Sequence, residues 1–323
     1  MDTFKNLIEV STYFSDKVRA HEYLVKLRWQ GAVKCAHCNH DKVYELKGAT
    51  KRYKCALCRE QFSATKGTIF ENSAIPLQKW FVAIYLITAP KKGISSHQLA
   101  RDLSITQKSA WFVLHRVRFA LQSGTFVHSA NAIIEIDETF VGGETKNKHE
   151  DKIERNEKTG HAISTKVPVL GIIERGGNVT TKVVKNIHKK TLLPEIHKNV
   201  KEGAQVMTDD YSAYNDLKLK YDHQTVNHSI KEYVRGNVST NSIENFWSLF
   251  QRGIIGIYHH ASVKHLDKYL DEFEFRFNSR KFTERDRFDK MLGKMSKRLT
   301  YAQLISDGNE NKVDYFQFRP ESE

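Results

Sequence analysis

Alternating apolar and polar residues run through the middle of this 323-residue chain and predict a set of strands. The runs "AIIEIDETFVGG" and "KVPVLGIIERGG" each end in a glycine pair, and "NVTTKVVKN" follows the second at hairpin distance. Further along, "TLLPEIHKNV" has a helical pattern, "AQVMTDDYSAYNDL" predicts a buried strand leading into a short helix, and "HQTVNHS" predicts another strand. The helix "NSIENFWSLFQRGIIGIYHH" comes next. This order predicts an α/β fold, with helices packed on a mixed sheet.

A helical pattern precedes these strands. Trp80, Ile84 and Ile87 recur at helical spacing after Pro76, and "KKGISS" then interrupts the pattern. The segment "SHQLARDL" predicts a second helix, and "QKSAWFVLHRVRFALQ" predicts a longer third helix with basic residues. Short helix, turn and longer helix form the outline of a helix-turn-helix, although a plain packing domain shows similar spacing.

The first turn of the third helix is where a helix-turn-helix would contact base edges or phosphates. The candidates in this turn are Gln107, Lys108 and Ser109. Further along the same helix, Trp111, Phe112 and Leu114 are expected to pack in the core.

All four cysteines lie in one short N-terminal stretch, in the order Cys35, Cys38, Cys55 and Cys58. Two C-x2-C pairs separated by 16 residues match the spacing of a four-thiolate structural zinc site, and "YELKGATKRYK" between them predicts a small hairpin. Two disulfides are the alternative, but no export signal points to an oxidising compartment. His37 and His40 are expected to be bystanders, because four thiolates fill a tetrahedral shell.

The charge of the chain points to a polyanionic partner. It carries 51 Lys and Arg against 38 Asp and Glu, a net charge of +13, and nucleic acid fits best. A basic protein without such a partner is the alternative. The longest apolar run, "WFVAIYLITA", is shorter than the roughly 20 residues that cross a bilayer, and the N-terminus lacks a signal-peptide pattern. We therefore expect a cytoplasmic protein without a membrane partner.

Three acidic residues stand at the ends of predicted elements. Asp137 ends one strand, Asp209 ends another in "VMTDD", and Glu244 opens a helix in "TNSIENFW". Carboxylates that converge in this way can hold two divalent cations, which offset the repulsion between the acids. Two magnesium ions about 3.5 to 4 Å apart activate the attacking oxygen and stabilise the leaving one in phosphodiester chemistry. The basic surface would then hold the DNA backbone while the acidic pocket meets the scissile phosphate.

Other interpretations apply to the acids near these three. We expect Glu135 and Glu138 on the strand face opposite the first aspartate, solvated or against the charged segment that follows. Asp210 is expected in a turn or as a helix cap. Glu244 could serve only the helix dipole, and Asn241, three residues before it, could either cap the helix or reach a metal.

Several motifs together carry a resemblance to a known family. The cysteine ribbon, "GTIFENSAIPLQKWF", "IEIDETFVGG", "TDDYSAY" and "VSTNSIENFWSLFQRGIIGIYHH" resemble the zinc-ribbon insertion-sequence transposases of the DDE superfamily. The most similar branch is the ISXO-like group, related to the eukaryotic Merlin elements, and the resemblance covers roughly residues 15 to 285. It implies a ribonuclease-H-like catalytic domain, magnesium or manganese as cofactor, and cleavage and joining of DNA at the inverted repeats of the element.

The patterns and the resemblance predict four segments. Residues 1–65 hold an N-terminal helix and the zinc ribbon, 66–128 the helix-turn-helix region, 129–285 the catalytic domain with a charged insertion at 142–166, and 286–323 a basic helical tail. We expect DNA ends and target DNA as partners, a homodimer or higher oligomer on the DNA, and association with the nucleoid of a prokaryote.

The resemblance also implies roles for single residues. Asp137 and Asp209 match the first two catalytic acids, and the third falls in "TNSIEN". Both Asn241 and Glu244 are candidates there, and we favour Glu244, which lies 35 positions after Asp209.

The resemblance departs from the family pattern at one position. Many related enzymes place a lysine two helical turns after the catalytic glutamate, and this chain has Gln251 there. Arg252 is the next residue, rotated by about 100° around the helix axis. Either Arg252 supplies the positive charge in place of the lysine, or the contact with DNA is neutral and positions the DNA less firmly. His228 in "VNHS" resembles a position near the active site, where it contacts phosphate or makes a structural hydrogen bond.

Three functions follow from these patterns. The chain is a transposase that cuts and joins DNA, a DNA-binding regulatory protein with a non-catalytic acidic domain, or a metal-dependent nuclease that cuts without joining. Three acids in their motif context favour the transposase.

Overall fold

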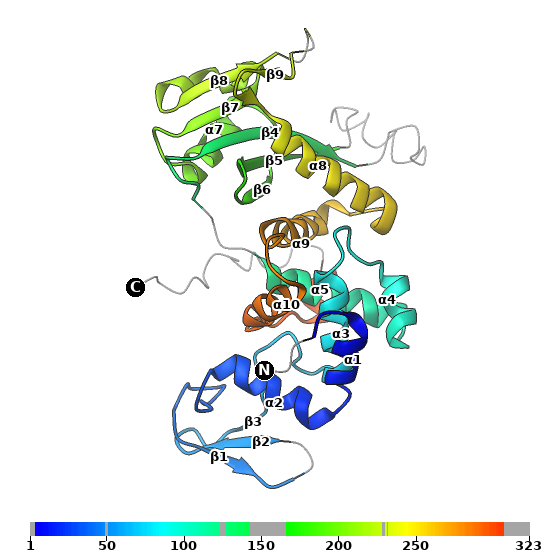
Figure 1. Cartoon of the computed structure of the whole chain (residues 1–323). Helices are drawn as coiled ribbons and strands as arrows, with labels where there is room; N and C mark the ends of the chain where they lie inside the picture. Colours follow the sequence, from blue (N-terminus) through cyan, green and yellow to red (C-terminus); the bar gives the residue numbers. More distant parts are fainter. Residues whose placement is uncertain are drawn as a thin grey trace.

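The computed structural model describes residues 4–48, 51–122, 127–142, 166–227, 230 and 232–306. A mixed sheet lies at one end of the molecule, a small cysteine-bearing hairpin lies at the other, and helices connect them (Figure 1). Most of the expected charged insertion at 142–166, the last residues of the chain and His228 fall outside the described residues.

A five-stranded sheet forms the first region, with β4 (Ile133–Val141) at its centre. The strand order is β6-β5-β4-β7-β8, in which β4, β5 and β6 pair antiparallel, and β4, β7 and β8 pair parallel. The other strands are β5 (Val167–Glu174), β6 (Val179–Val183), β7 (Gln205–Asp209) and β8 (Asp222–Val226). The predicted fold class, a mixed sheet with helices packed on it, is confirmed.

The two faces of the sheet are covered by different helices. Ile134 and Ile136 of β4 share a buried cluster with α7 (Lys189–Asn199) and the 3-10 helix η2 (Ser212–Leu219). Val141, an odd-numbered residue of the same strand, shares a cluster with α8 (Asn241–Gly253), which lies across the opposite face (Figure 1). Because side chains alternate along a strand, the odd-numbered residues of β4 face α8.

The helical region has a core of its own, to which segments far apart in the sequence contribute. Its helices are α1 (Leu7–Tyr13), α2 (Lys17–Trp29), α3 (Leu77–Thr88), α4 (Ser96–Leu103), α5 (Gln107–Leu121) and α10 (Glu284–Gly293). Phe81 of α3 lies 4.6 Å from Phe14 and 5.8 Å from Phe288 between ring centroids. Helix α10, which begins two residues before the predicted C-terminal segment, thus packs within the core of the N-terminal helices.

Helix α5 joins the helical region to the sheet through buried charges. Arg118 lies inside the protein and its Nε donates to Glu272 of α9 (Leu266–Asn278) over 2.5 Å. Glu272 also accepts from the Tyr258 hydroxyl at 2.6 Å and pairs with Arg276. Tyr258 ends the π-helical turn η4 (Ile254–Tyr258), which continues α8. Buried and paired charges of this kind fix the two regions against each other.

The cysteine-bearing hairpin is extended by a short third strand into a small three-stranded sheet. Its strands are β1 (Val43–Leu46), β2 (Arg52–Cys55) and β3 (Gln61–Phe62), and β1 pairs antiparallel with β2 as predicted. The remaining elements are β9 (Val234–Arg235), β10 (Val238–Ser239), the 3-10 turn η5 (Val263–His265) and α11 (Tyr301–Ile305). None of the helices in the described ranges is long and apolar enough to span a bilayer.

Candidate active site and zinc site

The four cysteines converge at the turns of the hairpin. The Sγ atoms of Cys35, Cys38, Cys55 and Cys58 all lie within 4.8 Å of one another. The backbone N–H groups of His37 and Leu57 donate to the Cys35 and Cys55 sulfurs at 3.4 and 3.3 Å. This donor set suits a structural zinc ion, which takes four thiolates in a tetrahedron.

The alternative of two disulfides does not fit this geometry. All four cysteines are free, and the Sγ–Sγ separations of 3.6 Å for Cys38 and Cys55 and 3.7 Å for Cys35 and Cys58 are far beyond the roughly 2.05 Å of a disulfide bond. The side chains of His37 and His40 are not part of the cluster.

Asp137 and Asp209 lie on adjacent parallel strands. Strand β4 pairs with β7 in the register Ile133 with Gln205 and Glu135 with Met207. Two residues further along each strand come Asp137 and Asp209, which therefore lie side by side on the face that α8 covers. Asp209 is the last residue of β7, and one of its oxygens accepts from the Tyr211 N–H at 3.1 Å.

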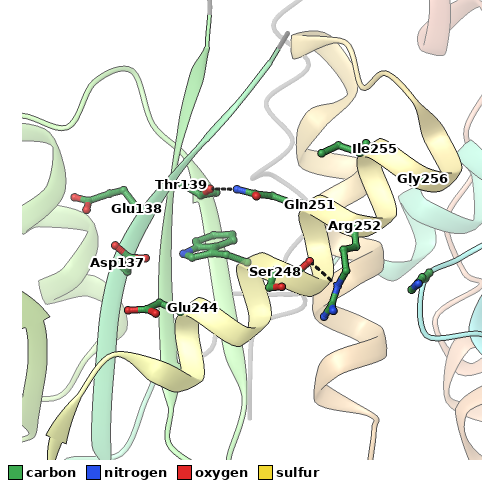
Figure 2. Close-up of a pocket in the computed structure, with 11 residues that line it drawn as sticks. Asp137, Glu138, Thr139, Glu244, Ser248, Gln251, Arg252, Ile255 and Gly256 are labelled. Atoms are coloured by element: carbon green, nitrogen blue, oxygen red, sulfur yellow. Dashed lines mark hydrogen bonds between the residues drawn. The ribbon is translucent and has the colours of Figure 1, made fainter. Parts of the chain in front are cut away.

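Glu244 approaches Asp137 from helix α8. Both side chains line a pocket of about 620 Å³, and Figure 2 shows the Glu244 carboxylate reaching toward β4. The Thr240 hydroxyl donates to Glu244 Oε1 at 2.7 Å and holds this rotamer. Asn241 is exposed and does not line the pocket, and Asp210 is exposed beyond the end of β7.

Burial and like charge both act on the first aspartate. They raise the pKa of Asp137 to about 7, burial contributing most and the charges of Asp209 and Glu244 adding to it. A bound divalent cation would favour the charged form of these acids, and clustered carboxylate oxygens are the ligands that magnesium prefers. Among the residues that the structure describes, only the cysteines form a cluster with all ligating atoms within 4.8 Å, so the acids are spaced more widely.

The expectation for Glu135 is wrong. Strand side chains repeat every two residues, so Glu135 lies on the same face as Asp137, and its side chain is fully buried. Its carboxylate accepts from the backbone N–H groups of Ser242 and Ile243 at 2.7 and 3.1 Å and pairs with Arg175 at 2.8 Å. N–H groups at the start of a helix have no acceptor within the helix itself, and Glu135 accepts from these two. Glu135 therefore caps α8, the helix that carries Glu244.

Glu138 lies on the face opposite Asp137, as expected, and it is half-buried; it is also among the residues that line the pocket. Figure 2 shows its side chain pointing away from α8, toward the side covered by η2. Burial raises the pKa of Glu138 to about 7, and the charges of Asp137 and Asp209 add to the shift while Tyr214 opposes it.

A glycine allows α8 to approach the sheet beside the first aspartate. Gly171 of β5 pairs directly with Asp137, and a Cβ atom at Gly171 would collide with the Trp247 ring and lie 2.8 Å from Ile243. Because Gly171 has no side chain, α8 can pack closely against the sheet, and this packing determines where Glu244 lies relative to β4.

The two helix residues considered for DNA contact also line the pocket. Gln251 Nε2 donates to the Thr139 hydroxyl at 3.0 Å, and Arg252 Nε donates to the Ser248 carbonyl at 3.1 Å (Figure 2). Both side chains are exposed. Gln251 is thus held by the sheet, and Arg252 lies along its own helix.

The first turn of α5 is the outward part of that helix. Gln107 and Lys108 are exposed and Ser109 is half-buried, with the Lys108 ammonium 4.9 Å from the Tyr301 ring centroid. Arg116 and Arg118 lie in the interior, where Arg116 donates to backbone carbonyls. The basic residues in the body of the helix are therefore buried, and the exposed residues of α5 lie in its first turn.

We expect Glu135→Gln to lower the free energy of unfolding by about 3 kcal/mol, because Arg175 and the helix start lose a buried charge. Chemical denaturation measures the change. Glu202→Gln, which breaks the exposed pair with Lys220, is the matched control and should leave stability nearly unchanged. Equal effects of the two substitutions would contradict the capping role.

Comparison with known proteins identifies relatives of this chain. Residues 129–278 match the sequence profile of the ISXO2-like transposase domain, and residues 15–61 match that of the transposase zinc-ribbon domain. A protein in transposable element ISH50 of Halobacterium salinarum is 28% identical over 283 residues, which cover 84% of this chain and 93% of that protein. A transposase-like protein of Haemophilus influenzae is 34% identical over 102 residues, covering 31% of this chain and 81% of the relative. No solved structure matches the chain.

Proposed function

This chain belongs to the ISXO2-like transposase family, and we propose that it binds the ends of its insertion sequence and catalyses metal-dependent strand cleavage and strand transfer. The observation that carries the proposal is the grouping of Asp137, Asp209 and Glu244 on one face of the sheet. Such a group is costly without a cation, since burial and the charges of Asp209 and Glu244 disfavour the charged form of Asp137.

The residues have separate tasks in this proposal. Asp137, Asp209 and Glu244 would hold the magnesium or manganese ions, which would supply activation of the attacking oxygen and stabilisation of the leaving one. Thr240 and Glu135 orient Glu244 from the helix start. Asn241 is exposed and does not line the pocket, whereas Glu244 does, and this favours Glu244 as the third residue.

An assay of strand cleavage and joining tests the proposal. The substrate is a duplex with the inverted repeat that brackets the coding sequence, incubated with the full chain and Mg²⁺ or Mn²⁺. Joined products support the transposase. Cleavage without joining would identify a nuclease, and a mobility shift without chemistry would identify a DNA-binding protein with an inert acidic domain.

We expect the affinity for random-sequence duplex DNA to fall steeply with salt, because the +13 charge makes phosphate contacts that release counterions. A log–log plot of affinity against salt concentration should have a slope of roughly −0.9 per phosphate contact. Fluorescence anisotropy over a salt series measures it. An affinity that does not change with salt would contradict the prediction that the basic surface binds the DNA backbone.

The proposal includes a homodimer or higher oligomer on the DNA, because an element has two ends and each needs an active site. Light scattering of the chain with and without end DNA measures the assembly. A complex with one chain on each DNA end and no association between the ends would contradict it.

A further inference from the structure

The loop between α3 and α4 brings a cation from the helical region to the acidic pocket. Lys92, in this loop, lines the pocket together with Asp137 and Glu244, although these acids belong to the sheet region. Its side chain is exposed. Among the described residues that line the pocket, Lys92 and Arg252 are the cations, and Arg252 lies along its own helix.

The loop is held firmly at its start. Arg276 of α9 donates from Nε to the Ile87 carbonyl at 3.1 Å, and Arg287 of α10 donates to the Thr88 and Ala89 carbonyls at 3.3 and 3.2 Å. These carbonyls are among the last of α3, where a helix leaves acceptors unpaired and favours positive charge. The first residues of the loop are therefore fixed by two arginines of the C-terminal helices.

The middle of the loop is fitted against the end of α8. Gly93 has φ of +93°, and a Cβ atom there would collide with the Tyr258 hydroxyl and lie 2.6 Å from Arg276. A Cβ atom on Gly253 would lie 3.2 Å from the Lys92 carbonyl oxygen. The backbone at Lys92 is thus packed closely on α8 and η4, while its side chain remains in solvent at the rim of the pocket.

A DNA strand seated on this pocket needs positive charge close to the acids. Its phosphates repel the carboxylates, and the metal ions act only at the scissile phosphate. Gln251 carries no charge, and its amide is engaged with Thr139. A lysine on a fixed backbone supplies a point charge on a flexible stem, which suits a phosphate of varying position.

We infer that Lys92 contacts a backbone phosphate next to the scissile one and supplies the charge that Gln251 lacks. The inference rests on the proposed function, since it places the cut strand in the acidic pocket. Lys92 is a DNA-contact residue that belongs to the helical region. The segment that leads into α4 at Ser96 therefore also reaches the site of cleavage.

The test couples a change in the protein to a change in the DNA. Duplexes with the terminal inverted repeat carry a neutral methylphosphonate at one position at a time around the cut. Binding is measured without added Mg²⁺ or Mn²⁺ and without a chelator, so that no strand is cut and the cysteine site is left intact. At one position, the wild-type chain should lose about tenfold in affinity, the worth of one hydrogen bond to a charged group. Lys92→Gln should bind unmodified DNA about tenfold more weakly and lose nothing further at that position.

Two variants complete the experiment. Lys91→Gln changes the neighbouring exposed lysine, which does not line the pocket, and should still lose affinity at that methylphosphonate. Lys92→Arg should restore both affinity and the methylphosphonate effect. Thermal melting should be the same for all of them, because both lysine side chains are exposed.

The outcomes distinguish a failure of the inference about Lys92 from a failure of the proposed transposase function. If Lys92→Gln and the wild-type chain lose the same affinity at every methylphosphonate, Lys92 makes no phosphate contact and the inference is overturned. Cleavage by the wild-type chain in Mg²⁺ or Mn²⁺ is measured in parallel and reports on the proposed function alone. A chain that cuts DNA but shows no coupling refutes only the role of Lys92.

Discussion

Asp137→Ala should abolish strand cleavage and strand transfer together, and Asp209→Ala should do the same. Both steps use the same metal ions on successive oxygens, so neither step survives the loss of a shared ligand. Product analysis on labelled end DNA measures both steps. Binding to DNA ends should persist, because the zinc ribbon and the first turn of α5 do not line the acidic pocket.

Neighbouring acids supply the controls for this result. Asp210→Ala removes an exposed carboxylate next to Asp209 and should keep most of the activity. Glu138→Ala should also keep substantial activity, because its side chain points to the opposite side of β4 (Figure 2). An inactive but folded Asp210→Ala chain would mean that the second acid has been misassigned.

The third residue is decided by a pair of truncations. Glu244→Ala is expected to be inactive and Asn241→Ala active in magnesium, since Glu244, unlike Asn241, lines the pocket with Asp137. Circular dichroism establishes that both variants are folded. Activity in Glu244→Ala together with inactivity in Asn241→Ala would show instead a site of two aspartates and one asparagine.

Cys35→Ser should release about one zinc ion per chain and unfold the hairpin. Structural zinc contributes on the order of 10 kcal/mol to small domains of this kind, and three thiolates hold it far less well than four. A colorimetric zinc assay of the purified chain measures the loss, and end-specific binding should fall with it. The sheet region should melt as before, because the hairpin has a separate hydrophobic cluster.

A histidine in the same stretch provides the control for zinc. His37→Ala should retain its zinc, since the cluster of ligating atoms consists of the four cysteines. Full zinc content in Cys35→Ser would contradict the four-thiolate site.

Local patterns were sufficient to predict the sheet and the cysteine site. Strand alternation, glycine pairs and helical periodicity are short-range signals, and β4, β5, β6, α7, β7, β8 and α8 appear in the predicted order. The two C-x2-C pairs lie close together in the sequence, so their spacing alone indicates that the four sulfurs can converge on one metal ion. Asp209 at the end of β7 and Glu244 in the first turn of α8 likewise follow from the predicted elements. The expectation that Asp137 ends its strand is wrong, because β4 continues four residues further to Val141 and pairs with β5 along that length.

Long-range contacts were not accessible in the same way. The role of Glu135 depends on α8, which begins more than a hundred residues later, although strand parity alone would have placed it on the face of Asp137. Nothing near Lys92 in the sequence indicates that its loop packs on Gly253. The burial of Arg118 likewise depends on Glu272 of a distant helix.

The packing of α10 among the N-terminal helices has a consequence for synthesis on the ribosome. Phe288, Met291, Leu292 and Met295 are buried in the same cluster as Phe14 and Phe81. The N-terminal helices are synthesised first, but their hydrophobic core is complete only after α10 has been synthesised. The sheet region is synthesised between these two parts of the chain. A copy of the gene with an early stop codon then yields an N-terminal fragment whose apolar core is open, a substrate for proteases. Damaged copies of the element would thus leave few stable fragments to compete with the intact protein for DNA ends.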